Sequence, residues 1–198
     1  MSYPVGFEMD YVKRRSRLTT FFRYILAIPQ FVFAWFYAIA FYVVLIIAWF
    51  ALLFTGRWPR GLYGFAGGFL RYITRFSAYF FLGVDKYPPF SGAEDDSYPV
   101  RVHIAPPLDR YSRLKVFFRP IYAILAIVIR YALGVVLSFV AFLSWFAIVI
   151  TGRQPASLQN ALNFSLSYTT RSDALIFLIT QTYPALEEGD ATPGQLTS

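Results

Sequence analysis

The sequence contains no cysteine and few charged residues, and each shortage excludes a class of site. Without cysteine, the chain cannot form a disulfide framework, a thiolate metal site or a cysteine nucleophile. Charged residues make up only 15% of the chain, whereas about 25% is usual in soluble domains. Apolar residues reach 57% and aromatic residues 21%, so the composition predicts a membrane protein.

Acidic residues are missing from the two most apolar parts of the chain. No Asp or Glu lies between Asp10 and Asp85, or between Asp109 and Asp173. A proton- or sodium-coupled transporter needs intramembrane carboxylates, so this class is disfavoured. The single histidine, His103, falls in a predicted strand, where a surface role is expected, and the sequence contains no metal-binding motif. We therefore expect a protein that is not an enzyme and that needs neither metal nor cofactor.

Two long runs of the chain carry no charge at all. No charged side chain lies in residues 24–56 or in residues 131–152. Either run exceeds the roughly 20 residues that cross a bilayer as an α-helix. Residues 1–20 carry a basic cluster and lack the apolar stretch of a secretory signal peptide, so we expect the N-terminus to stay in the cytoplasm.

A short motif occurs twice, as TGRWP from Thr55 and as TGRQP from Thr151, 96 residues later. The same offset aligns further stretches, among them SRL from Ser16 and from Ser112, and WFA from Trp49 and from Trp145. Self-similarity at one fixed offset indicates a tandem duplication. Within the motif, Gly56 and Gly152 are predicted to end the preceding helix in the left-handed conformation, a role that requires no ligand.

The duplication predicts an all-α integral membrane protein built from two tandem repeats. We place the first membrane repeat at residues 1–92, the second at 93–186, and a disordered polar tail at 187–198. Each repeat is expected to hold a short strand, a basic interfacial helix, an apolar segment and an amphipathic interfacial helix. Residues 3–11 and 98–104 alternate apolar and polar side chains, so these two strands could pair with each other.

The apolar segment of each repeat is too long for one upright helix. A straight helix over residues 24–54 or 120–150 would be about 45 Å long, against a hydrocarbon core of about 30 Å. Each segment could be a helical hairpin or one long bent spanning helix. Hairpins would place every basic residue except Arg130 on one side of the membrane, so the positive-inside rule favours hairpins. The choice between two and four spanning helices stays open.

Basic residues flank these segments, where anionic lipid is the nearest polyanion, rather than nucleic acid. Arg71 and Arg75 share one face of a predicted interfacial helix over residues 62–84, whose aromatic residues would face acyl chains. Arg130 is the one charge expected at membrane depth. The candidate residues for binding anionic lipid are Arg14, Arg17, Arg23, Arg57, Arg71, Arg75, Arg113, Arg119, Arg153 and Arg171.

Three stretches of the first repeat resemble a known family: SRLTTFFRYILAIPQ, WFALLFTGRWP and LRYITRFSAYFFLGVDKYPPF. They are similar to the bacterial membrane proteins known as domain of unknown function forty-three eighty-nine, which are frequent in actinobacteria. The second repeat departs from this pattern, since Gln154 replaces the aromatic residue before Pro155. The resemblance implies duplication and a membrane location, but no activity. We accordingly expect a multi-pass protein of the bacterial inner (cytoplasmic) membrane with both termini in the cytoplasm.

The sequence favours a non-catalytic accessory or scaffold protein that packs in a membrane complex or with itself. Its partners would be lipids with anionic headgroups, together with a membrane protein or further copies of the chain. Two alternatives remain. Apolar hairpins that fail to span fully would shape the membrane. Arg119 and Arg130, placed near a path, would instead suit a channel or carrier for an anion or a lipid.

Overall fold

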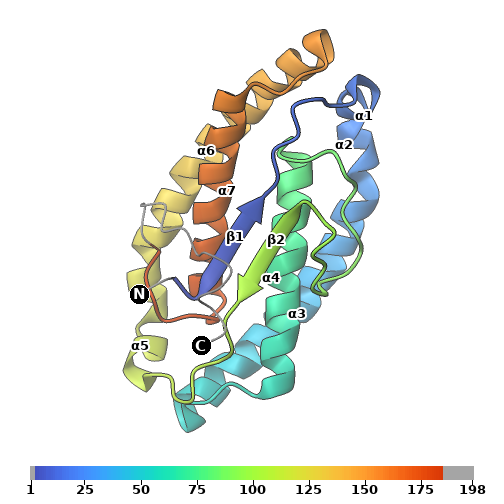
Figure 1. Cartoon of the computed structure of the whole chain (residues 1–198). Helices are drawn as coiled ribbons and strands as arrows, with labels where there is room; N and C mark the ends of the chain where they lie inside the picture. Colours follow the sequence, from blue (N-terminus) through green and yellow to red (C-terminus); the bar gives the residue numbers. More distant parts are fainter. Residues whose placement is uncertain (1–2, 185–198) are drawn as a thin grey trace.

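The computed structural model describes residues 3–184, and its elements follow the two repeats in order (Figure 1). The predicted tail over 187–198 lies outside the described residues. The first repeat contains β1 (Val5–Met9), α1 (Arg17–Phe21), α2 (Arg23–Leu26), α3 (Ile28–Thr55) and α4 (Arg60–Phe80). The second contains β2 (Val100–Ile104), α5 (Arg113–Phe117), α6 (Arg119–Thr151) and α7 (Ala156–Ile176).

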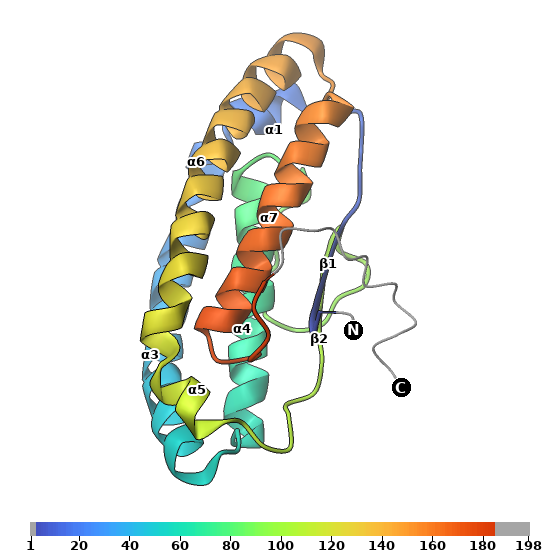
Figure 2. The ribbon, with the colours of Figure 1, turned by 90° about the vertical axis from the view of Figure 1, so that its left-hand side faces the viewer.

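The molecule has three layers, which Figure 2 shows from the side. The long apolar helices α3 and α6 form the outer layer, α4 and α7 form the middle layer, and a two-stranded ribbon covers the opposite face. α4 packs against α3 and β2, whereas α7 packs against α6 and β1. The middle layer is therefore covered on both faces, and its two helices carry more buried residues than the two long helices of the outer layer.

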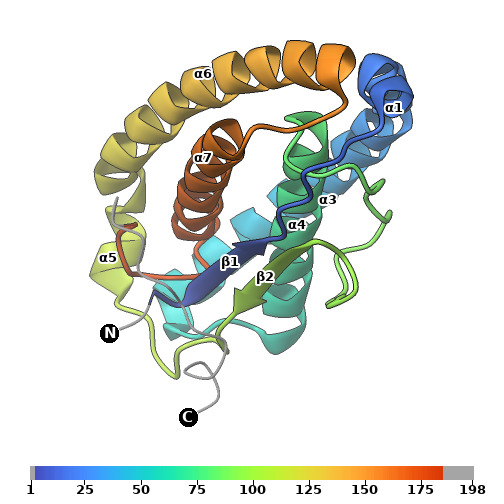
Figure 3. The ribbon, with the colours of Figure 1, turned by 45° about the horizontal axis from the view of Figure 1, so that its top comes forward.

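Each apolar segment is one continuous helix, so the expected hairpins are wrong. α3 has 28 residues and α6 has 33. At 1.5 Å per residue these helices are about 42 Å and about 50 Å long. Figure 3 shows that α6 bends around α7 along its length. Trp35 and Arg130, which lie where a hairpin would have to turn, are inside regular helix. The alternative of one long bent helix is therefore the one observed.

The two predicted strands pair with each other, as the alternation suggested. β1 and β2 are antiparallel, with Val5 opposite Ile104 and Met9 opposite Val100. The apolar residues of the ribbon face α4 and α7. On the other face Glu8 and Arg101 form a cross-strand ion pair of 3.1 Å, which joins the beginning of one repeat to the beginning of the other.

The repeats are intertwined rather than side by side. α1 packs on α6 of the other repeat, and α5 packs on α3 in the same manner. The TGR motifs take part, because the carbonyl of Gly56 accepts a hydrogen bond from the Tyr111 amide and that of Gly152 accepts one from the Arg15 amide. Gly56 and Gly152 have φ angles of 68° and 69°, so the predicted left-handed caps are confirmed.

α4 is packed between two protein layers, whereas the sequence predicted that it would lie at a lipid interface. Its aromatic face packs against α3, where the Phe76 ring meets that of Phe31 at 4.9 Å between centroids. Its Arg71 and Arg75 point to the other side, under the ribbon, and bond to backbone carbonyls of β2. The amphipathic pattern therefore reflects packing between two protein layers, which sequence periodicity alone does not distinguish from a lipid interface.

Candidate functional site

The outer layer presents an extended apolar surface. In the most hydrophobic windows of the two long helices, only 17% and 28% of the residues are buried. Both helices are long and apolar enough to cross a membrane. Exposed apolar surface on this scale indicates contact with a membrane or a protein partner. The large exposed side chains at the middle of this surface include Trp35, Phe36, Tyr42, Ile46, Tyr131, Val135, Phe139 and Phe142.

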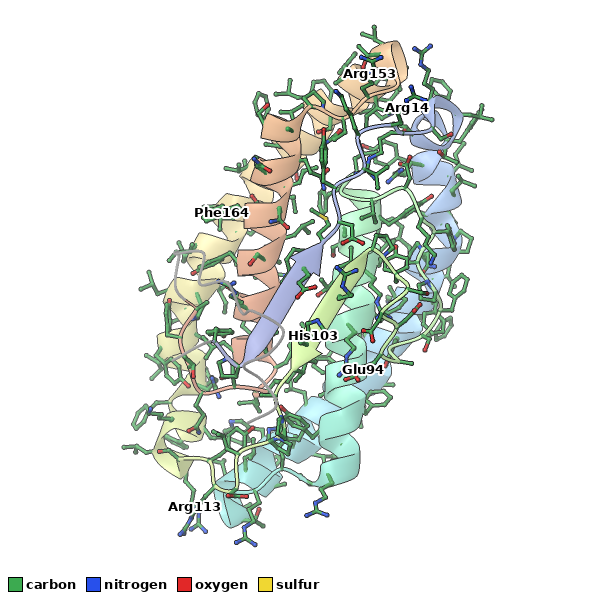
Figure 4. All side chains as sticks on the ribbon, in the orientation of Figure 1. Arg14, Glu94, His103, Arg113, Arg153 and Phe164 are labelled. Carbon is green, nitrogen blue, oxygen red and sulfur yellow. The ribbon has the colours of Figure 1, made fainter. Side chains whose placement is uncertain are left out.

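Five of the ten candidate arginines are exposed, and they gather at the two ends of this surface. Arg14, Arg17 and Arg153 lie at one end, where α1 meets the end of α6. Arg57 and Arg113 lie at the other end, where α3 meets α5. Figure 4 shows Arg14 and Arg153 at one end of the molecule and Arg113 at the opposite end.

The second end also has a polar hollow. Its volume is about 540 Å³, and its lining includes Arg57, Arg60 and Asp109. Two guanidinium groups against one carboxylate leave the hollow with excess positive charge, which suits an anionic headgroup. Arg60 was not among the candidate residues, although its place directly after the TGRWP motif is visible in the sequence.

The other five candidate arginines are held inside the molecule. Arg71 pairs with Glu94, and Arg75, with 2% of its surface exposed, donates to the backbone carbonyl of Ala93 at 2.8 Å. Burial lowers the pKa of the Arg75 guanidinium, whereas nearby Asp95 acts in the opposite direction. Both side chains fasten the middle layer to the ribbon and to the segment that precedes it, rather than facing headgroups.

Arg23, Arg119 and Arg171 are also buried. Arg23 is bound on several sides, because it donates to the carbonyls of Tyr79 and Val84 at 2.6 Å each and pairs with Asp85 at 2.5 Å. A buried cation requires this kind of compensation. The candidate lipid-binding set is thus reduced to the exposed arginines at the two ends.

Arg130 has a partner that the sequence did not identify. Its Nε lies 2.7 Å from Oδ1 of Asp173, on α7. Burial raises the pKa of Asp173, and the ion pair with Arg130 opposes this shift. The first repeat has Ala34 and Ser77 at the equivalent positions, so the second repeat has both charges and the first has neither. That joint appearance was the signal in the sequence that could have predicted the pair.

The chain belongs to the family described as Domain of unknown function (DUF4389), whose pattern it matches twice, over residues 17–92 and 113–186. The two matches begin 96 residues apart, so they confirm the family resemblance and the duplication. Neither match includes the strands. No curated protein and no solved structure matches the chain.

Proposed function

We propose that this member of the family is a non-catalytic membrane scaffold that lies in one leaflet and gathers anionic lipids, alone or beside a protein partner. α3 and α6 would lie along the membrane plane, with their outer face toward acyl chains and the ribbon toward water. One observation carries the proposal: an apolar helical layer on one side of the molecule is opposed by a charged ribbon on the other. We propose the bacterial cytoplasmic membrane as its location.

The length of the helices supports an orientation in the plane. At about 42 Å and about 50 Å, both helices exceed the hydrocarbon core of about 30 Å by far more than a usual tilt of about 20° absorbs. A helix in the interfacial plane has no such limit of length.

The basic ends support the same orientation. Because α3 and α6 run in opposite directions, Arg14 and Arg153 lie at one end and Arg57 and Arg113 at the other. A spanning orientation would put one group on each side of the membrane, against the tendency of Lys and Arg to stay on the cytoplasmic side. In the plane, both groups reach the same headgroup layer, where each arginine contributes about 1 kcal/mol of attraction to anionic lipid.

The ribbon adds a third argument. It lies alongside the middle of α4 and α7 (Figures 1 and 2) and carries Glu8, Asp10 and Arg101 on its outer face. If the long helices crossed the bilayer upright, these charges and the ribbon's open edges would lie at membrane depth. Lipid-exposed sheet edges do not occur there, and charges are expensive there. In the plane, the ribbon faces water.

The proposal is tested by single cysteines, because the natural chain has none. Ser157 and Asp109 are both exposed. Ser157 lies in the first turn of α7, at one end of the molecule, and Asp109 precedes α5, at the other end (Figure 1). His103 lies on the ribbon. Each is replaced by cysteine, and cells are treated with a membrane-impermeant maleimide before and after the membrane is opened. We expect all three to be labelled from the cytoplasmic side only.

Tyr42, 60% exposed on α3, supplies the control, since Tyr42→Cys should be shielded by lipid and react only in detergent. Labelling of the Ser157 and Asp109 positions from opposite sides would establish a spanning orientation and refute the in-plane proposal. The in-plane proposal would also be refuted if the cysteine at position 103 were labelled only in detergent, because the ribbon would then lie within the membrane.

Membrane shaping is the second candidate function. The bent outer layer of Figure 3 would occupy one leaflet without an equal volume in the other, and such asymmetric insertion favours curvature. Purified protein added to anionic vesicles would then produce tubules visible by electron microscopy. Vesicles that bind the protein but keep their shape would refute membrane shaping and would remain consistent with the scaffold proposal.

A further inference from the structure

Arg119, the counterpart of Arg23 in the second repeat, is buried and has no acidic partner among residues 3–184. Only 4% of its surface is exposed. Its Nη2 donates to the carbonyl of Thr180 at 2.9 Å, but its Nε and Nη1 have no hydrogen-bond partner among residues 3–184. Its guanidinium lies 5.3 Å from the centroid of the Tyr122 ring, which offsets only part of the cost of burying a cation. An anion beside Arg119 would therefore be strongly stabilising.

The reason lies in one difference between the repeats. Asp85, which neutralises Arg23, is replaced in the second repeat by Gln181. Gln181 keeps one of the two contacts of Asp85: its Oε1 accepts a hydrogen bond from the Ser112 amide at 3.3 Å, as Asp85 Oδ2 accepts one from Ser16 at 2.9 Å. An amide carries no charge, and the structure gives Gln181 no bond to Arg119.

The same region of the second repeat is also hollow. A groove of about 320 Å³ opens on the apolar outer layer, between the second half of α3 and the start of α6, and Arg119 lies in its wall. The lining is otherwise apolar: Leu45, Ile46, Trp49, Pro120, Ala123, Ile127, Ile176 and Leu178. Among the residues that the structure describes, Arg119 is the only charged one in this lining, so the groove combines an apolar surface with one cation.

The first repeat fills the equivalent region with aromatic rings. Tyr24 and Phe31 both pack on Phe80, with ring centroids 5.5 Å and 5.2 Å apart. Their counterparts at the offset of 96 residues are Pro120, Ile127 and Ile176, which are smaller and line the groove. The second repeat therefore lacks both the acidic partner and the aromatic filling of the first.

We infer that this groove binds a single-chain anionic amphiphile, with its carboxylate or phosphate against Arg119 and its acyl chain along the apolar lining. The negative charge of the ligand follows from a guanidinium that has no acidic partner among the described residues, and the acyl chain follows from the apolar lining. A volume of about 320 Å³ is at the small end of ligand pockets, which favours one acyl chain over the two of a bilayer phospholipid. The inference does not depend on the orientation of the protein in the membrane.

The experiment uses the full chain in a neutral detergent and measures binding by quenching of Trp49 fluorescence, since this indole lines the groove. The probe is a brominated fatty acid of about 14 carbons, displaced in turn by myristate, myristyl phosphate, myristyl alcohol, a two-chain anionic phospholipid and inorganic phosphate. Trp49→Phe gives the background from the other tryptophans. We expect the two single-chain anions to bind at least tenfold more tightly than the others.

Gln181→Asp is the decisive variant, because it restores the acidic partner that the first repeat has. We expect it to weaken binding of the fatty acid at least tenfold and to raise the melting temperature of the ligand-free protein. The control is Gln181→Asn, because Asn matches Asp in size but carries no charge. This variant should bind the fatty acid as tightly as the natural chain does. A double change, Ile127→Phe with Ile176→Phe, copies the filled groove and should also abolish binding.

Equal affinity for myristyl alcohol and myristate would overturn the inference, because the cation would then have no role. Unchanged affinity in Gln181→Asp would overturn it as well. Tighter binding of the two-chain phospholipid or of inorganic phosphate would identify a different ligand for the groove and contradict the choice of one acyl chain.

Discussion

At the scale of single residues, the second repeat contains an ion pair that the first does without. Arg130 and Asp173 stand where the first repeat has Ala34 and Ser77. Such a pair must be gained or lost as a whole, because removing one charge leaves the other buried without compensation and destabilises the fold. The pair also gives Arg130 an acidic partner within the molecule. Because Asp173 would compete with an anion for the guanidinium, the pair argues against a role for Arg130 in an anion path.

This pair leads to a first prediction. Arg130→Ala should lower the free energy of unfolding by about 3–5 kcal/mol, because it strands the Asp173 carboxylate, which is 9% exposed. The double change Arg130→Ala with Asp173→Ser copies the first repeat and should recover most of this loss. Denaturant titration in detergent measures both. Equal destabilisation by the single and the double change would contradict the argument.

A second prediction concerns pH. Burial raises the pKa of Tyr111 to about 12, and its hydroxyl donates to the carbonyl of Ile179 at 2.9 Å. The unfolded tyrosine ionises near its ordinary pKa of about 10, so this group's contribution is complete below pH 10 and is lost as pH rises toward 12. Stability should therefore fall across this window.

Tyr111→Phe should lose about 1 kcal/mol at neutral pH with the hydrogen bond, and its stability should fall less steeply above pH 10. Melting temperatures at pH 8 to 12 compare the two proteins. Parallel curves would show that Tyr111 does not carry the alkaline transition.

At the scale of elements, the segment between the repeats is fixed to α4 by close approach of two backbones. A Cβ at Gly92 would collide with the backbone of Gly68. The backbone that lies against Gly68 therefore belongs to the linker between the repeats rather than to another helix. Gly64, on the same helix, has open space around its Cβ position.

These two glycines give a third prediction with its own control. Gly92→Ala should destabilise the protein by about 3 kcal/mol, because the linker must move away from α4 and overpacking is unfavourable. Gly64→Ala should instead stabilise it by up to about 1 kcal/mol through helix propensity. Thermal unfolding separates the two, and a loss of stability in Gly64→Ala would mean that its face is covered.

At the scale of the whole molecule, the two sequence repeats are structurally intertwined. The strands pair across the repeats, and each short basic helix packs on the long helix of the other repeat. The two TGR motifs also connect the repeats. Gly56 and Gly152 each end a long helix, and the carbonyl of each accepts a hydrogen bond from a backbone amide of the opposite repeat. The two family matches therefore delimit sequence repeats whose structures complete each other.

A fourth prediction follows from this exchange. A chain cut after Asp96 should yield two fragments that do not fold separately, because each lacks its strand partner and the cover of its long helix. Expressed together, they should form a one-to-one complex with the stability of the intact chain less the effect of the lost connection. Hydrogen exchange detects the folding. A first fragment with protected α3 and α4 amides on its own would refute the prediction.

The sequence by itself determined what depends on local or periodic patterns. Uncharged runs predicted the long apolar helices, alternation predicted β1 and β2, and the constant offset predicted the duplication. The left-handed helix caps at Gly56 and Gly152 were also predictable, because a cap depends only on local backbone geometry.

Tertiary structure alone decided which face of each element meets protein and which stays open. Amphipathic periodicity reports that two faces differ but not what covers them, so Arg75 was expected at headgroups and lies under the ribbon. A helical hairpin and one long bent helix share the same hydropathy profile, and only the structure, in which α3 and α6 are each continuous, distinguishes them. The partners of Arg23, Arg119 and Arg130 depend on contacts between distant segments, which no local pattern records.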